Sequence, residues 1–275
     1  MKNILIATDF SPAARNATDY ALRLAKALHG KVTLMSACRE IPILTPDPAV
    51  ILGNTDQREI VQHRLEQEVD NLMSEKPLAI DVRVEEGPTS LAVLEAASDA
   101  SADLIVVGMT ATAKGGRRVF GSTATGLARK SPIPLLVVPE TAKFETPVGI
   151  ALADDVIGDK DREIPAAVRE LAEQFNARIF LIRMFNKETG EVIEVLHQSA
   201  NRLQTIASFS SLAEIQVGSD VAKALEAFIE VHPVSILAMR PKQRSLPAQW
   251  LFGSTTRDMI FESTIPLLIL PEMKK

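Results

Sequence analysis

Three short segments combine residue types that suit nucleotide binding. Asp9 follows the apolar run of residues 3–8, and Gly108 ends a second apolar run at 104–107. Thirteen residues after Gly108, a helical pattern opens with Gly121, Ser122 and Thr123. A carboxylate can accept hydrogen bonds from ribose hydroxyls, and a glycine lets a ribose or phosphate approach the backbone. Because amides at a helix N-terminus favour an anion, the combination predicts a site for ribose and phosphate.

Each segment also has an ordinary structural interpretation. Asp9 or Ser11 can cap a helix that begins at Pro12, while Gly108 can be a plain turn and Ser122 another cap. Taken singly, these roles are the more frequent ones, because short motifs often match by accident. In open parallel sheets, however, ligands lie beyond the carboxyl ends of the strands where the strand order reverses. If the strands before Asp9 and Gly108 are neighbours, their joint placement in one crevice favours binding.

Other chemistry has less support in the sequence. Lys114, Arg117 and Arg118 lie between Gly108 and Gly121 and can screen phosphate charge. They accept no proton, so no general base for hydrolysis stands out. The chain has no G-x-x-x-x-G-K-[S/T] loop and no G-x-G-x-x-G fingerprint, and its four histidines are scattered, so we expect no metal ligation. The single cysteine, Cys38, is expected to be a small buried apolar residue.

Alternating apolar patterns show which elements must position these residues. Strands are predicted at 3–8, 32–37, 80–84, 103–107 and 134–138. Amphipathic helices are predicted at 12–29, 56–75, 88–100 and 122–130. The strands are short and almost continuously apolar, which indicates a parallel sheet covered on both faces.

The chain contains this unit twice. Residues 119–140 read VFGSTATGLARKSPIPLLVVPE and residues 251–272 read LFGSTTRDMIFESTIPLLILPE, with 11 of 22 positions identical at an offset of 132. This similarity indicates a duplication. Strands of the second unit are predicted at 148–153, 178–184, 212–217, 235–239 and 266–270. We therefore expect two domains, at residues 1–141 and 146–275.

The layout resembles the universal stress protein family, which carries a G-x2-G-x9-G-[S/T] loop after its fourth strand. Gly108, Ala111, Gly121 and Ser122 occupy the positions of that loop, and the strand-one Thr8-Asp9 and the closing SPIPLLVVP are also similar. The resemblance covers both units. It implies an α/β fold of two tandem, doubly wound, Rossmann-like domains, each with a five-stranded parallel sheet in the order 3-2-1-4-5.

The resemblance also implies an adenine nucleotide, ATP, ADP or AMP, between strands one and four, with Mg²⁺ as a candidate companion of the phosphates. Adenine and ribose would be surrounded by Ala7, Thr8, Asp9 and Ala37. Gly108 would meet the ribose, and the phosphates would meet Ala111, Gly121, Ser122 and Thr123. Ala111 adds one methyl group to the family's loop, but it keeps the backbone amide.

The second unit departs from this pattern. Its fourth strand ends in Ile236–Pro241 without a glycine, and counting from Ala238 makes the loop to Gly253 two residues longer than its counterpart. Met184 replaces Ala37 and would crowd a purine, while Asp154 is the match for Asp9. We therefore expect Gly253-Ser254-Thr255 to be only a helix start and the second site to be empty.

Together with these features, the resemblance implies a cytoplasmic stress-response regulatory protein that binds an adenine nucleotide in its first domain. The alternatives are a slow ATP hydrolase on the same fold and an interaction module without nucleotide, which Ala111 favours. The net charge of −5 argues weakly against a nucleic-acid partner. No apolar run approaches the ~18–20 residues that span a bilayer, and the lone cysteine suits a reducing compartment.

The two closing strands, at 134–138 and 266–270, are apolar edges without protective charges. Universal stress domains are similar to one another in pairing such edges into dimers. We expect an intrachain pseudo-dimer whose interface includes Leu136, Val138, Leu268 and Leu270. Two independent domains, each recruiting another chain into a homodimer, are the alternative.

Overall fold

The computed structural model describes residues 1–38, 54–75, 79–109, 122–153, 164–186, 210–217, 221–240 and 264–271. The first half of the chain supplies β1 (Asn3–Ala7), α1 (Pro12–Leu28), β2 (Lys31–Cys38), α2 (Asn54–Glu75), β3 (Ile80–Glu86), α3 (Thr89–Asp99), β4 (Leu104–Met109), α4 (Ser122–Lys130) and β5 (Leu135–Pro139). The second half supplies β6 (Gly149–Ala153), α5 (Ala166–Phe175), β7 (Arg178–Asn186), β8 (Ser210–Val217), α7 (Val221–Val231), β9 (Ile236–Met239) and β10 (Leu267–Ile269).

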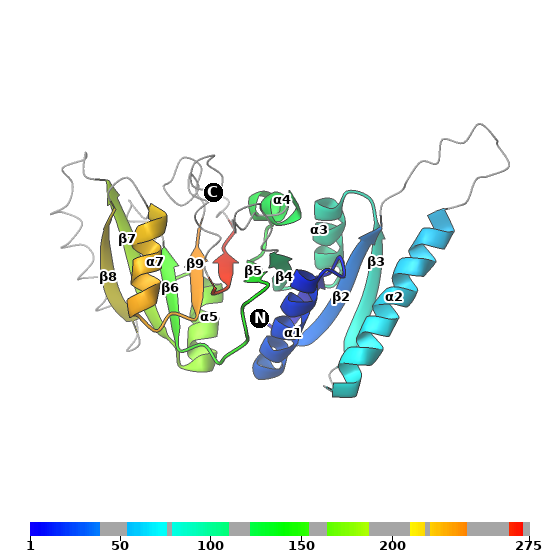
Figure 1. The fold of residues 1–275 in the computed structure, drawn as a ribbon, viewed down its shortest axis with the longest axis horizontal. Coiled ribbons are helices and arrows are strands. Elements are labelled where there is room, and N and C mark those ends of the chain that lie inside the picture. The colour runs from blue at the N-terminus through cyan, green and yellow to red at the C-terminus, as the bar shows by residue number, and fades with distance from the viewer. Residues whose placement is uncertain are drawn as a thin grey trace.

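All of these strands belong to one sheet of ten strands, which crosses the whole molecule (Figure 1). Its order is β3-β2-β1-β4-β5-β10-β9-β6-β7-β8. Each half therefore has the predicted 3-2-1-4-5 order with parallel neighbours, and the predicted strands lie within two residues of the observed ones. The doubly wound α/β fold is confirmed, with the two five-stranded sheets continuous with each other.

Helix α1, which follows β1, has clear local signals at both ends. Ser11 caps α1 by accepting a hydrogen bond from the Ala14 amide at 3.2 Å, and Pro12 occupies the first turn. His29 ends the helix in the left-handed conformation, with φ 51°. Helix α5 ends in the same way at Asn176, also with φ 51°. Asparagine and histidine both adopt this conformation more readily than most residues. The two equivalent helices thus end in the same way, as expected for a duplicated unit.

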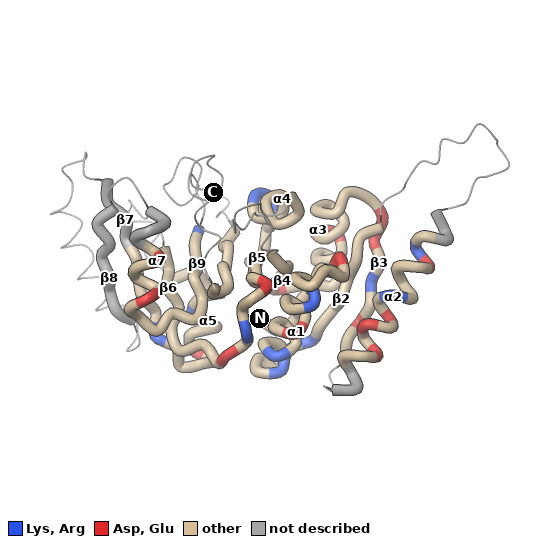
Figure 2. Tube along the Cα trace, in the orientation of Figure 1, with Lys and Arg blue, Asp and Glu red and all other residues tan. Residues whose placement is uncertain are grey.

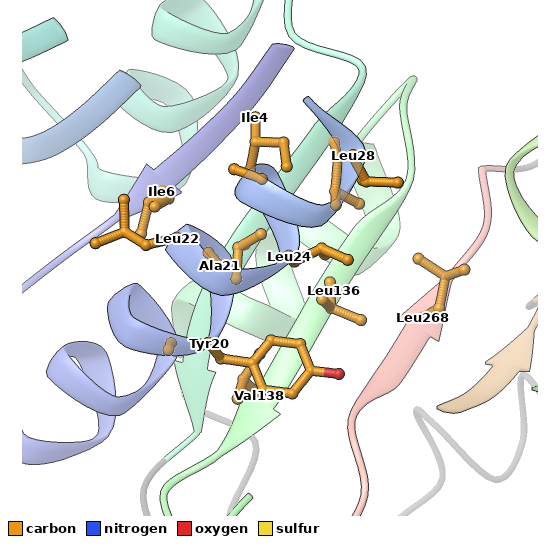
Figure 3. Packing of buried hydrophobic residues seen from close by; sticks show 14 of the residues in the cluster. Ile4, Ile6, Tyr20, Ala21, Leu22, Leu24, Leu28, Leu136, Val138 and Leu268 are labelled. Carbon is orange, nitrogen blue, oxygen red and sulfur yellow. The ribbon is translucent and has the colours of Figure 1, made fainter. Parts of the chain in front are cut away.

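Apolar side chains fill both faces of the sheet, and each core extends across both halves. One core lies on the side of α3, α4 and α7 and includes Leu5, Leu135 and Leu237. The other lies on the side of α1, α2 and α5 and includes Ile4, Leu136 and Ile236. Figure 3 shows the second core, where α1 places Tyr20, Ala21, Leu24 and Leu28 over the sheet. Among the described helices, none has the length and apolar character needed to cross a membrane.

Strands β5 and β10 join the two halves in antiparallel orientation. Their register pairs Leu135, Leu136 and Val137 with Ile269, Leu268 and Leu267, respectively. The tube in Figure 2 carries no charged residue along either strand. The predicted interface residues Leu136, Val138, Leu268 and Leu270 are all buried. The predicted intrachain pairing of the two closing strands is thus confirmed.

The segment between β5 and β6 is held against α1. The Asn16 side-chain amide donates hydrogen bonds to the carbonyls of Pro139 and Ala142, at 2.9 and 2.8 Å. The Phe144 ring contacts Tyr20 edge-on, with centroids 5.2 Å apart. Farther along, Gln174 of α5 donates to the Ala27 carbonyl of α1 at 3.2 Å. These contacts fix the connection between the halves on one face of the sheet.

We expect Val137→Asp to lower the free energy of unfolding by at least about 3 kcal/mol, because it would bury an unpaired carboxylate at the joint. Val137 is fully buried, whereas Val148, which is 58% exposed, allows the same substitution outside the core. Val148→Asp should change stability by only about 0.5 kcal/mol. Urea denaturation of both variants measures the difference, and equal losses would contradict a buried joint at β5 and β10.

Candidate functional site

Strand β1 lies between β2 and β4, where the strand order of the first half reverses. Ala7 pairs with Met35 on one side and with Val107 on the other. The residues that come next are therefore Thr8, after β1, and Gly108, in β4. The condition set by the sequence is met: Asp9 follows β1, Gly108 lies near the end of β4, and these two strands are direct neighbours whose carboxyl ends lie at the same edge of the sheet.

Thr8 fixes the turn between β1 and α1. Its amide donates to the Met35 carbonyl at 2.9 Å, and its carbonyl accepts from the Ser36 hydroxyl at 2.9 Å. Its own hydroxyl accepts a hydrogen bond from the Phe10 amide at 3.0 Å. Thr8 and Ser36 are both buried. Thr8 is thus a positioning residue for the turn, and Ser36 is a partner that its polar type in an apolar strand could have suggested.

Asp9 lies exposed at this end of the sheet. One of its carboxylate oxygens, Oδ1, accepts a hydrogen bond from the Ser11 amide at 3.0 Å. Because Ser11 supplies the helix cap, the structure decides between the two capping candidates in favour of Ser11. The carboxylate of Asp9 therefore stays at the surface, where its second oxygen and its charge face solvent.

Phe10 is a feature that sequence reasoning missed. It adopts φ 64°, a left-handed conformation that is uncommon outside glycine, asparagine and aspartate. Its ring is buried beside α1 and α2, and the Arg64 guanidinium of α2 lies 4.2 Å from the ring centroid. No local sequence signal marks a phenylalanine for this conformation. Packing of the ring and the Thr8 hydrogen bond compensate for the backbone strain.

Gly108 is required by the close approach of α1. A Cβ atom at this position would lie 2.5 Å from the Ala13 carbonyl oxygen and 2.7 Å from the Ala14 nitrogen. These are backbone atoms of the first turn of the helix, so they cannot rotate away. The glycine therefore lets the N-terminal end of α1 pack directly on the end of β4, beside Asp9.

Four of the remaining predicted residues are described, and they lie on the α3 and α4 side of the same edge. Ala7 and Ala37 are partly buried and pack against the core on that side. Ser122 and Thr123 are the first residues of α4, with Ser122 exposed and Thr123 partly buried. Ala111, Gly121, Lys114, Arg117 and Arg118 lie outside the described residues.

A family model described as the universal stress protein family matches residues 1–139. The chain belongs to the universal stress protein family. Over 96 residues it is 30% identical to stress response protein NhaX of Bacillus subtilis, a match that covers 34% of this chain and 58% of the length of that relative.

Solved structures extend the similarity of fold to the whole chain. A universal stress protein from Archaeoglobus fulgidus has a TM-score of 0.71 at 14% identity, with 98% of each chain covered. A protein of unknown function from Pseudomonas aeruginosa has a TM-score of 0.60 at 13% identity, with 98% of this chain and 92% of the other covered. At these identities the comparison supports the fold alone.

The second half of this universal stress family member follows the same strand register but ends its strands differently. Ala7 pairs with Val107, and the corresponding pair is Ala153 with Met239. Arg240 therefore stands where the first half has Gly108. The expectation that the second loop is two residues longer is wrong, because it counted from Ala238 instead of Arg240. Both loops span thirteen residues to their Gly-Ser pairs.

The same register corrects one further match. With Ala153 equivalent to Ala7, the counterpart of Asp9 in the sequence is Asp155 and not Asp154. Met184 does occupy the strand position of Ala37, since Ala7 pairs with Met35 and Ala153 with Ile182. The side chain of Met184 and residues 154, 155 and 253–255 lie outside what the structure describes.

The cysteine at the same edge is buried, as the sequence predicted. Burial raises the pKa of the Cys38 thiol, and the nearby Glu86 carboxylate raises it further, while Arg58 lowers it. The net upward direction of the pKa keeps the thiol protonated at neutral pH. Cys38 therefore acts as an apolar residue at the end of β2.

We expect Gly108→Ala to destabilise the protein by about 1–3 kcal/mol, because the added methyl group forces the first turn of α1 off the sheet. Gly126→Ala on α4 is the matched control, since its new Cβ would meet the Ser90 Cβ at 3.1 Å and the exchange favours the helix. Its stability should stay within about 1 kcal/mol of the parent protein. Urea denaturation that finds Gly108→Ala as stable as the parent would contradict the close contact.

Proposed function

We propose that residues 1–141 form a domain that binds one adenine nucleotide at the carboxyl ends of β1 and β4. Residues 146–275 form a related domain that binds none. The observation that carries the proposal is the meeting of Asp9, Gly108 and the N-terminal end of α1 at the point where the strand order reverses. Ligands of open parallel sheets are found at this point.

The described residues offer groups that fit a nucleoside. The exposed Asp9 carboxylate is anchored by the Ser11 amide and can accept hydrogen bonds from ribose hydroxyls. Ala7 and Ala37 present only methyl groups on the α3 and α4 side, where a flat purine can lie against them. Thr8 keeps these residues in place through its three backbone and hydroxyl contacts.

Phosphates would be held at the start of α4. Ser122 and Thr123 present hydroxyls and amides where the helix dipole favours negative charge. Ala111 and Gly121 complete this group in the family's loop pattern, and Mg²⁺ would accompany the phosphates. The nucleotide is ATP, ADP or AMP, and its phosphate count depends on how far the loop between Gly108 and Gly121 reaches.

The role we propose is regulatory binding in a stress response. Asp9 is assigned to the ribose, and the basic residues of the loop, Lys114, Arg117 and Arg118, stabilise charge without accepting a proton. Binding of the nucleotide would then be the signal that the protein carries. A slow hydrolase and a nucleotide-free interaction module are the two outcomes of the test below that would replace this role.

Calorimetric titration with ATP, ADP and AMP should find one site per chain. The asymmetry between Gly108 and Arg240 at equivalent strand ends is the reason to expect a single site. Two equivalent sites would contradict the assignment to the first half, and no binding of any of the three would favour the interaction module. Phosphate release measured in the same samples identifies a hydrolase if it occurs at a rate proportional to site occupancy.

Asp9→Ala should weaken nucleotide binding by about 1–3 kcal/mol, the loss typical of a charge-assisted hydrogen bond. Asp9→Asn keeps an oxygen for the Ser11 amide, so it separates the loss of charge from damage to the turn. Asp155→Ala, the equivalent change in the second half, should leave the affinity unchanged. If Asp155→Ala were the damaging substitution, the nucleotide would belong to the other half.

A further inference from the structure

The turn that carries Asp9 is in contact with a helix outside the proposed site. Arg64 of α2 places its guanidinium carbon 4.2 Å from the ring centroid of Phe10, the residue that follows Asp9. Phe10 is only 8% exposed and belongs to the core on the α1, α2 and α5 side. A cation over the face of an aromatic ring at this distance is attracted to it. The contact therefore links α2 to the neighbour of the residue assigned to the ribose.

The backbone of Phe10 transmits this contact to Asp9. Its φ of 64° is costly for a phenylalanine, and the chain keeps it only because surrounding contacts hold it. The hydrogen bond from the Ser11 amide to Asp9 Oδ1, at 3.0 Å, spans Phe10. A rotation of Phe10 to an ordinary negative φ would therefore move the Ser11 amide away from the Asp9 carboxylate. The position of the carboxylate thus depends on the contacts that hold the Phe10 ring.

Arg64 is itself held where it can perform this role. Helix α2 packs on β2 and β3 at one flank of the sheet and buries Leu65 and Val69 (Figure 1). One turn after Arg64, Glu68 is partly buried and lies close to the charges of Arg64 and of Arg15 on α1. Burial raises the pKa of Glu68, and the two arginines lower it. The carboxylate therefore gives the Arg64 guanidinium a nearby counter-charge, at the i,i+4 spacing that suits an ion pair on a helix.

Arg64 and the proposed nucleoside lie on opposite faces of the sheet. Ala7 and Ala37, which are assigned to the purine, pack against the core on the α3 and α4 side. Phe10 belongs to the other core, which α2 covers together with α1. An effect of Arg64 on the nucleotide must therefore pass through the turn at Phe10 and not through contact with the base.

We propose that Arg64 is a positioning residue, which holds the Asp9 carboxylate in place through the Phe10 ring. The carboxylate meets the ribose already oriented, so less conformational freedom is lost when the nucleotide binds. Nucleotide affinity in the first domain thus depends on a helix that does not contact the base. The consequence for affinity rests on the proposed function, whereas the hold of Arg64 on Asp9 does not.

Calorimetry on Arg64 variants tests the effect on affinity. Arg64→Gln should raise the Kd of whichever of ATP, ADP and AMP the parent protein binds most tightly by roughly 3–5-fold, the equivalent of an exposed cation–π contact. Arg64→Lys keeps a cation over the ring and should retain most of the affinity. Arg58→Gln is the matched control, because it removes the same charge from α2 at a position that pairs with Glu86 instead, at 3.4 Å. An equal loss in Arg58→Gln, or an unchanged Kd in Arg64→Gln, would overturn the proposal.

A double-mutant cycle shows whether Arg64 acts through the ring. Phe10→Leu keeps an apolar side chain but removes the aromatic face, so it should raise the same Kd by at least as much as Arg64→Gln. In the Phe10→Leu protein, Arg64→Gln should then change the Kd by less than about twofold. Losses that simply multiply would mean that Arg64 acts on the nucleotide by another route, and they would contradict the proposal.

Hydrogen exchange in the nucleotide-free protein tests the hold of Arg64 on Asp9 by itself. The Ser11 amide reports on the carboxylate, since it donates to Asp9 Oδ1. Its exchange, followed by NMR, should be about 3-fold faster in Arg64→Gln and unchanged in Arg58→Gln, because only the first substitution loosens the turn. Equal rates in Arg64→Gln and the parent protein would overturn the proposal. Faster exchange in a protein that binds none of the three nucleotides would refute the proposed function and leave this positioning role intact.

Discussion

The antiparallel pairing of β5 with β10 is the interaction on which the rest of the structure depends. Only three residue pairs form it, yet it covers the two apolar edges that the halves would otherwise expose. Both cores pass through this joint, with Leu135 and Leu136 on opposite faces of β5. The outer edge at β3 carries Asp81, Arg83, Glu85 and Glu86, the type of residue that discourages further pairing. The two halves of the sheet are thus joined at its centre by apolar strands, and charged residues on β3 discourage pairing with another chain at this outer edge.

The two halves show how one strand register supports different strand ends. The register is identical from β1 to β4 and from β6 to β9, but the residue after the last matched pair is Gly108 in the first half and Arg240 in the second. The glycine permits the first turn of α1 to pack directly on the end of β4, whereas a buried arginine occupies the equivalent position after β9. The chemistry of the edge therefore changes without any change in the sheet that supports it.

Apolar periodicity and the internal repeat were sufficient to predict most of the fold. They predicted the strand bounds, because these depend on patterns within a strand and on the similarity of the two units. The order 3-2-1-4-5 and the pairing of the two closing strands were implied by the resemblance to the family. For the site, the condition that the strands leading to Asp9 and Gly108 be neighbours is met, because β1 pairs with β4.

Features that depend on tertiary packing could not be predicted from the sequence. The need for glycine at position 108 comes from the approach of α1, and the conformation of Phe10 comes from its ring contacts with α2. The loop length of the second half was misjudged because no glycine marks the strand end, and arginine is not a residue expected in a core. Only the pairing of Ala153 with Met239 shows where that strand position lies.

Residues 140–148 connect the halves while tied to α1 through Asn16 and Phe144, and this has a consequence for how the protein could diversify. Two separate copies of one domain would dissociate on dilution, but a covalent, anchored connection keeps the partners together at any concentration. In a pair of identical chains, every inherited substitution appears on both sides of the symmetry axis. Here a change such as arginine for glycine is confined to one side, so one half can give up an ancestral role while its neighbour retains it.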